Sequence, residues 1–182
     1  MNETIEIIRL TAEDNHLQKE LATLTLDTVC HGASIGFMET LTKKEACAFW
    51  ENVFERVARQ QLILFVARQV STDKVVGTIQ LLIDLPANQT HRADVAKLQV
   101  HSGSRRQGIG RLLLHAVEAE AIRLGRFLLV LDTVTESAAY YLYQREGWSI
   151  VGHIPDYALF PNGMYCNTTY FFKKLKELPK RK

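Results

Sequence analysis

Cysteine is scarce in this chain of 182 residues. Its three cysteines, Cys30, Cys47 and Cys166, are odd in number and far apart, and no CxxC pair is present. None of the six histidines has another four residues away, so no pair with metal-ligand spacing exists. These features exclude a disulfide framework and are explained by reduced thiols in a cytosolic protein. We therefore expect no metal site.

Long hydrophobic runs and strong net charge are also missing. Apolar stretches such as 127–131 are too short to cross a bilayer, and the N-terminus lacks the pattern of a signal peptide. The net charge is only +2, which gives no reason to expect a polyanionic partner. We interpret the basic end, about residues 176–182, as a solvated tail. The sequence thus predicts a cytoplasmic protein that binds neither nucleic acid nor membrane.

The composition, 47% apolar and 23% charged, is that of an ordinary globular protein. No repeat, low-complexity segment or linker interrupts the chain, so residues 1–182 are expected to form a single domain. Hydrophobic periodicity predicts the order β-α-α-β-β-β-α-β-α-β-β. Expected strands lie at about 5–10, 62–68, 75–84, 92–100, 127–132, 148–157 and 165–175, and expected helices at about 17–28, 42–57, 109–124 and 137–146. This alternation predicts an α/β fold with a mixed sheet of about seven strands, flanked by about four helices.

The most informative pattern is the loop at 102–108, which leads from a strand directly into a helix. The first amides of a helix, at its positive dipole end, favour a phosphate group. Gly108 and Gly110 let the backbone approach an anion without a Cβ in the way. Three arginines add positive charge beside these glycines: Arg105, Arg106 and Arg111. The alternative is that the glycines mark only a turn and the arginines a solvated helix end.

Two common phosphate motifs do not fit this loop, because it has neither the Gly-Lys-Ser/Thr ending of a P-loop nor the three glycines of a dinucleotide fingerprint. Arg105-x-x-Gly108-x-Gly110 instead resembles the acetyl-CoA motif of the GNAT superfamily of N-acetyltransferases. The stretch Ala139-x-x-x-Tyr143-x-x-x-Gly147-Trp148 is similar to a later signature of that superfamily, and the element order fits its fold. One departure is Ser102-Gly103, where many members carry a proline. The resemblance implies the GNAT fold and acetyl-CoA as co-substrate.

Four segments, at 32–38, 92–98, 128–133 and 155–163, resemble the tabtoxin-resistance acetyltransferases. Members of that group acetylate a β-lactam amino-acid toxin, so the resemblance suggests a small-molecule amine as acceptor and a role in toxin or antibiotic detoxification. Asp94 stands where a glutamate is usual in that group. A shared scaffold does not fix the acceptor. The alternatives are a protein N-acetyltransferase and a non-catalytic CoA-binding regulatory module. Many superfamily members dimerise, so the resemblance also suggests a homodimer.

By analogy with the superfamily, twelve residues are expected to bind acetyl-CoA. The end of a strand offers backbone donors, the loop and helix start hold the pyrophosphate, and the next helix contributes two more side chains. They are Leu98, Gln99, Val100, Arg105, Arg106, Gln107, Gly108, Ile109, Gly110, Arg111, Ser137 and Tyr140.

Acetyl transfer to an amine requires a base for the amine and an acid for the leaving thiolate. Position in the Tyr-x-x-x-Gly pattern makes Tyr143 the expected acid; the alternative is a core aromatic. Asp94 is the first candidate base, because strand parity places it on one face with Leu98 and Val100; it could instead pair with Arg92 or Lys97. Asp132 is the second candidate, and its alternative role is to cap the next helix.

The acceptor pocket is expected between the loop at 31–38 and the last hairpin. His31, Phe37 and Tyr157 are the candidate substrate-binding residues. Phe37 could equally be an ordinary loop anchor.

Overall fold

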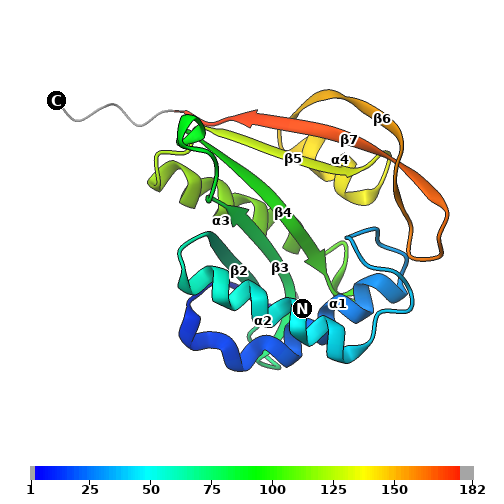
Figure 1. Cartoon of the computed structure of the whole chain (residues 1–182). Helices are drawn as coiled ribbons and strands as arrows, with labels where there is room; N and C mark the ends of the chain where they lie inside the picture. Colours follow the sequence, from blue (N-terminus) through cyan, green and yellow to red (C-terminus); the bar gives the residue numbers. More distant parts are fainter. Residues whose placement is uncertain (1–2, 177–182) are drawn as a thin grey trace.

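The computed structural model describes residues 3–176, and a seven-stranded sheet forms its centre (Figure 1). The strands follow the order β1-β2-β3-β4-β5-β7-β6, and only β4 and β5 pair in parallel. They are β1 (Ile5–Leu10), β2 (Leu62–Gln69), β3 (Lys74–Leu82), β4 (Arg92–Val100), β5 (Leu128–Val134), β6 (Ser149–Leu159) and β7 (Tyr165–Lys174). The predicted α/β fold with a mixed seven-stranded sheet is confirmed.

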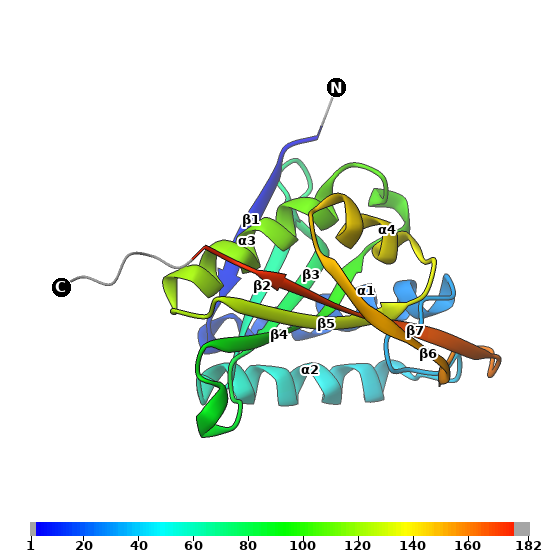
Figure 2. The ribbon, with the colours of Figure 1, turned by 90° about the horizontal axis from the view of Figure 1, so that it is seen from above.

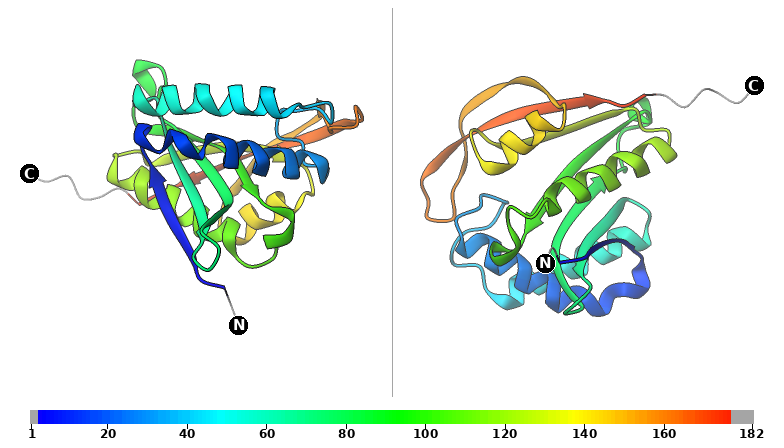
Figure 3. Two further views of the ribbon diagram at one scale, coloured as in Figure 1. Left: turned by 90° about the horizontal axis from the view of Figure 1, so that it is seen from below. Right: turned by 180° about the vertical axis from the view of Figure 1, so that it is seen from behind.

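Four α-helices cover the two faces of the sheet: α1 (Gln18–Cys30), α2 (Lys43–Ala58), α3 (Ile109–Arg123) and α4 (Ala138–Arg145). Figures 2 and 3 show α1 and α2 on one face and α3 and α4 on the other. Each helix layer encloses its own core: Trp50 and Leu21 are buried on the α1/α2 side, and Leu113 and Phe171 on the α3/α4 side. The sheet is therefore a central layer, and a ligand can reach it only through an opening in the sheet or at its ends.

Side-chain caps set several helix starts. Thr42 and Glu45 form the predicted capping box of α2, with Thr42 Oγ1 accepting from the Glu45 amide at 3.2 Å. Thr11 and Asp14 form a second box at the 3-10 segment Ala12–Leu17, which precedes α1. Ser137 caps α4. Because each of these caps joins residues that are close in the sequence, these helix starts can be predicted from the sequence.

Strands β4 and β5 diverge after a short parallel ladder. Their pairing runs only from Arg92 opposite Leu128 to Asp94 opposite Val130. Beyond these residues β4 stays with β3 while β5 stays with β7. The two halves of the sheet thus open like a V, and the divergence is plain in Figure 1.

A β-bulge in β4 overturns the predicted strand parity. Thr78 lies opposite Gln99 but Gln80 lies opposite Ala96, so β4 contains one extra residue, and Lys97 adopts a φ of +54°. The extra residue reverses the alternation of side chains. Before it, Ala93 and Val95 face the α3/α4 core; after it, Leu98 and Val100 do. The expectation that Asp94 shares a face with Leu98 and Val100 is therefore wrong.

The predicted charged tail lies outside the described residues, apart from Lys176. None of the helices within residues 3–176 is long and apolar enough to span a membrane.

We expect Gly77→Ala to destabilise the fold, because β3 touches both β4 and α3 at this glycine. A Cβ there would lie 3.0 Å from the Gln99 carbonyl oxygen and 3.0 Å from Leu113 Cδ1. Overpacking of this kind costs about 1–3 kcal/mol of unfolding free energy, measurable by urea titration. Gly152→Ala is the matched control, because a Cβ added to that strand glycine would meet no atom within 4 Å. Equal stability of the two variants would contradict this packing argument.

Candidate active site

A large cleft opens where β4 and β5 diverge. Its volume is about 1330 Å³, whereas a site for one drug-sized ligand occupies about 300–1,000 Å³. Residues of β4, β5, α3, α4, the end of α1 and the β6–β7 hairpin line it. The cleft therefore reaches both faces of the sheet and has room for two substrates that meet inside it.

The cleft-facing edge of β4 carries backbone groups that β5 does not pair. Gln99 lies opposite Thr78, with its carbonyl directed at β3, and the His101 amide donates to Val76 in β3 at 2.9 Å. By alternation the backbone of Val100 between them points away from β3, and its carbonyl lies 3.4 Å from Arg105 Nε. Leu98, Gln99 and Val100, three of the residues predicted to bind acetyl-CoA, all line the cleft. An extended ligand that carries amide groups can pair with such an open edge.

Among the helices of residues 3–176, α3 is the one that starts at the cleft without a side-chain cap. Its N-cap residue, Gly108, has a φ of +81° and makes no capping hydrogen bond. The first amides of the helix, at Ile109, Gly110 and Arg111, thus keep free N–H groups. All four residues line the cleft. A helix N-terminus of this kind is suited to a phosphate group.

The two glycines of the motif serve different purposes. A Cβ on Gly108 would meet no atom within 4 Å, so this position leaves open space at the mouth of the cleft. A Cβ on Gly110 would lie 3.1 Å from Leu142 Cδ2, so that glycine lets α3 approach α4. Open space around the missing Cβ, which we predicted for both glycines, is found at Gly108.

The loop before α3 is anchored to α1 through Asp27. The carboxylate of Asp27 accepts from the Ser102 amide and from Ser102 Oγ, each at 2.7 Å. These hydrogen bonds lower the pKa of Asp27 against the opposing effect of burial, which is the largest single influence. Asp27 therefore stays ionised at neutral pH and holds the loop in place.

The three motif arginines differ in their surroundings. Arg105, Arg106 and Arg111 are all exposed and line the cleft. Arg111 Nε lies 3.4 Å from Glu146 and shares its charge with that carboxylate. Two other residues predicted to bind the cofactor, Gln107 and Tyr140, do not line the cleft, and Tyr140 packs against Phe171 instead. Ser137 does line it.

Tyr143 lies in the core and at the cleft at the same time. Its ring is 4% exposed and packs against Trp148 and Phe171 in the core, yet the residue also lines the cleft. Burial raises the pKa of its phenol, and the charge of Asp132 raises it further. The hydroxyl makes no hydrogen bond within residues 3–176. Tyr143 therefore remains a protonated and uncommitted donor at neutral pH.

The two candidate carboxylates are placed differently. Asp94 forms a short ion pair with Arg92, one of its two alternative partners. Burial raises the pKa of Asp94, and the Arg92 charge opposes that shift only in part. Asp94 does not line the cleft, whereas Asp132 does, as an exposed residue that accepts from Thr168 Oγ1 at 3.1 Å. Ser137 rather than Asp132 caps α4, so the capping alternative for Asp132 is wrong.

The loop that follows α1 meets the β6–β7 hairpin across one end of the cleft. Ser34 Oγ donates to the Leu159 carbonyl at 2.7 Å, and the Glu39 amide donates to the Pro161 carbonyl at 3.0 Å. We call residues 31–41 and the hairpin tip 159–165 the roof. Of the three candidate substrate-binding residues, His31 and Tyr157 line the cleft. Phe37 does not, because it packs edge-on against Phe49 with 5.1 Å between ring centroids.

Lys97 is a cleft residue that the sequence analysis did not propose. From the bulge in β4 its Nζ donates to the Ile35 carbonyl at 2.7 Å, and it lies 5.7 Å and 5.8 Å from the ring centroids of Phe37 and Phe49. Burial lowers the pKa of Lys97, and the charge of Asp132 partly restores it. The available signal was a lysine with apolar neighbours on both sides, Ala96 and Leu98. Lys97 ties the roof to β4.

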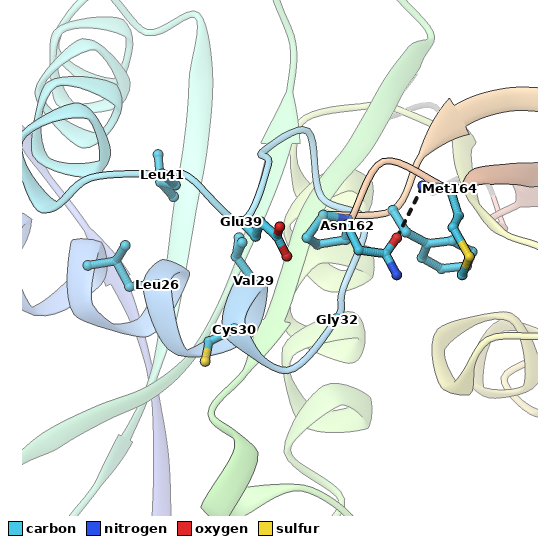
Figure 4. Close-up of a pocket in the computed structure, with 10 residues that line it drawn as sticks. Leu26, Val29, Cys30, Gly32, Glu39, Leu41, Asn162 and Met164 are labelled. Atoms are coloured by element: carbon cyan, nitrogen blue, oxygen red, sulfur yellow. Dashed lines mark hydrogen bonds between the residues drawn. The ribbon is translucent and has the colours of Figure 1, made fainter.

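A second pocket of about 640 Å³ lies between the end of α1 and the roof, which provides most of its lining (Figure 4). Figure 4 shows Glu39 of the loop beside Asn162 of the hairpin turn, with Leu26, Val29 and Leu41 to the left of Asn162. Among the described residues that line this second pocket there is no lysine or arginine that could bind a phosphate group. Across residues 3–176, no group of three or more His, Cys, Asp or Glu side chains could hold a metal ion. The larger cleft is therefore the candidate active site.

Three solved structures are similar to this chain over nearly their whole length. An N-acetyltransferase from Staphylococcus aureus Mu50 shares 18% identity, with a TM-score of 0.75 and coverage of 95% of this chain and 99% of its own. A ribosomal-protein-alanine N-acetyltransferase from Brucella melitensis shares 22%, with a TM-score of 0.73 and coverage of 93% and 99%. The yncA protein of Salmonella typhimurium, solved with its cofactor acetyl-CoA, shares 19%, with a TM-score of 0.74 and coverage of 100% and 99%.

These identities are low, so the three structures show a common fold. The family model described as the acetyltransferase (GNAT) domain matches residues 60–150, which is half of the chain. The matched segment contains the bulge, the loop with its glycines, α3, β5 and α4. The chain therefore belongs to the GNAT family of acetyltransferases.

Proposed function

We propose that this protein transfers the acetyl group of acetyl-CoA directly to a primary amine of a small molecule, with both substrates bound in the cleft. The observation that carries the proposal is the uncapped start of α3, which opens into the cleft that Tyr143 and Asp132 also line. A site for a diphosphate and groups suited to proton transfer thus share one space.

The chain offers contacts for each part of acetyl-CoA. The free amides of α3 and the exposed Arg105 and Arg106 suit the pyrophosphate. The open edge of β4 suits the amides of the pantetheine arm, which would run along Leu98 and Val100 toward the bulge. This path places the thioester where β4 and β5 separate, between Asp132 and Tyr143.

The proposed reaction has three proton-dependent parts. The acceptor amine, with a pKa of about 10 in water, must lose a proton before it attacks the thioester carbonyl. Asp132, which lines the cleft, or Asp94, acting through water, accepts that proton. As the carbon–sulfur bond breaks, the Tyr143 hydroxyl gives its proton to the thiolate of CoA. The nitrogen loses its second proton as the amide forms, and that proton returns to Tyr143, which regenerates the phenol. The raised pKa of Tyr143 keeps that proton available over the physiological range.

The roof favours a small molecule over a protein as the acceptor. A protein substrate needs an open groove for the residues that follow its reactive amine. Here the loop after α1 is hydrogen-bonded to the hairpin through Ser34 and Glu39 and to β4 through Lys97. The retained Tyr143 and carboxylates argue against a non-catalytic CoA-binding module. The resemblance to tabtoxin-resistance enzymes makes amine-bearing toxins and antibiotics the first acceptors to screen.

Gly108→Ala should weaken acetyl-CoA binding by about tenfold or more, because its methyl group would enter the space left for phosphate. The measurement is calorimetric titration with acetyl-CoA. Gly125→Ala is the matched control: Gly125 also has a positive φ, +71°, and open space around it, but it lies at the other end of α3. Both variants carry a similar backbone strain, about 1–2 kcal/mol. Equal affinities of the two variants for acetyl-CoA would rule out phosphate binding at the start of α3.

Tyr143→Phe should lower kcat by about 10²–10⁴-fold, while the Kd for acetyl-CoA stays close to that of the wild type. The phenylalanine ring keeps the packing against Trp148 and Phe171 and removes only the donor. Turnover is followed by release of the CoA thiol. Near wild-type turnover would remove Tyr143 from the mechanism.

The pH profile distinguishes the two candidate bases. A base must be ionised, so kcat/KM should fall as the pH drops through its pKa. Because burial raises the pKa of Asp94, its acid limb should lie above the range of an ordinary aspartate. If Asp94 is the base, Asp94→Asn loses that limb and Asp132→Asn keeps it; the reverse result assigns Asp132. Wild-type profiles in both variants would mean that the amine arrives already deprotonated.

A further inference from the structure

Three buried side chains from three elements form a hydrogen-bonded chain beside the cleft. Trp50 Nε1 of α2 donates to Thr25 Oγ1 of α1 at 2.9 Å, and Thr25 Oγ1 donates to Gln99 Oε1 of β4 at 3.1 Å. All three residues are at most 2% exposed. An indole N–H can only donate, so the single proton of the Thr25 hydroxyl is left for Gln99.

This chain fixes the orientation of the Gln99 carboxamide. Its oxygen faces Thr25, so its nitrogen faces the other way. Gln99 Nε2 is fully buried and has no hydrogen-bond partner among the described residues. Leaving a buried donor unpaired is costly, and such a group commonly has a ligand or a water as its partner. Gln99 also lines the cleft.

The position of Gln99 identifies the ligand that can reach it. The bulge at Lys97 turns Gln99 toward the α1 side of the sheet, opposite to Leu98 and Val100. Thr28 and His31, at the end of α1, line the cleft on that side, whereas the amides that we propose to bind phosphate belong to α3. The roof also closes the α1 side. The Gln99 side chain therefore lies on the side of β4 that we propose for the acceptor amine, and not on the side proposed for the nucleotide.

We propose that Gln99 is a specificity-determining residue whose Nε2 donates a hydrogen bond to an oxygen atom of the acceptor molecule. The inference rests on the proposed function and narrows its substrate class. The acceptor is a bifunctional amine that carries a hydroxyl, carbonyl or carboxyl oxygen near the nitrogen that is acetylated. An N–H₂ donor selects such an oxygen and rejects a second ammonium group.

The test compares primary amines in matched pairs: amino alcohols and amino amides against alkylamines of equal length. The wild type should favour the oxygen-bearing member of each pair by about tenfold or more in kcat/KM, because without it the amide stays unpaired. Gln99→Met should abolish that preference and lower kcat/KM only for the oxygen-bearing amines. Gln99→Glu keeps the shape but replaces the donor with an acceptor, so it should reverse the preference toward diamines.

Gln80→Met is the matched control. Gln80 Nε2 is also buried without a partner among the described residues, but Gln80 does not line the cleft. This variant should keep the wild-type preference. Thermal unfolding of each variant checks that it folds, and either Gln99 variant alone suffices for the comparison.

Three results would overturn the inference. One is a wild-type enzyme that turns over both members of each pair equally, and another is a Gln99→Met variant that keeps the preference. In the third, Gln99→Met binds acetyl-CoA more weakly by calorimetry, and kcat/KM falls equally for both classes of amine. That result would mean that the Gln99 amide contacts acetyl-CoA and not the acceptor. Absence of CoA release by the wild type with every amine would instead refute the proposed function itself.

Discussion

The separation of β4 from β5 is the constraint on which the rest of this structure depends. Two parallel strands that stayed paired would leave no unsatisfied backbone between them and no path through the sheet. Their ladder ends at Asp94 and Val130, and from there each strand keeps only its outer neighbour. One sheet therefore provides an open polar edge and a passage that joins its two faces, and substrates bound on opposite faces can meet there.

The bulge at Lys97 gives that passage its chemical asymmetry. By adding one residue to β4, the bulge turns Leu98 and Val100 toward α3, whose first amides are the proposed phosphate site. It turns Gln99 toward α1. It also places a lysine where its amine can reach Ile35 in the roof. A single backbone irregularity thus separates the side that we propose for the nucleotide from the side that we propose for the acceptor. Bulges next to active sites often redirect side chains in this way.

The two halves of the opened sheet are held in position by contacts at both ends of the cleft. Asp27 fixes the loop before α3 from the side of α1, and Gly77 allows β3 to pack closely against α3. At the other end, Ser34 and Glu39 bind the hairpin. Tyr143 is held rigidly by aromatic packing, so its hydroxyl keeps its place without a hydrogen-bond partner in the described structure. Rigid support of this kind favours a group that must donate a proton at one point.

The sequence alone determined the elements and the family signature, because both depend on neighbours along the chain. Hydrophobic periodicity, the capping box at Thr42 and the spacing of Arg105, Gly108 and Gly110 are local, and the element order and the seven-stranded sheet followed from them. Only the tertiary structure decided the bulge at Lys97, the roof and the orientation of Gln99. Each arises from residues far apart in sequence: Lys97 meets Ile35 across 62 positions and Gln99 meets Thr25 across 74.

The sequence predicts Tyr140 and Phe37 as site residues, but their packing partners, Phe171 and Phe49, hold them outside the cleft lining. Periodicity assigns a residue to a face, but which partner covers that face is settled when the chain folds.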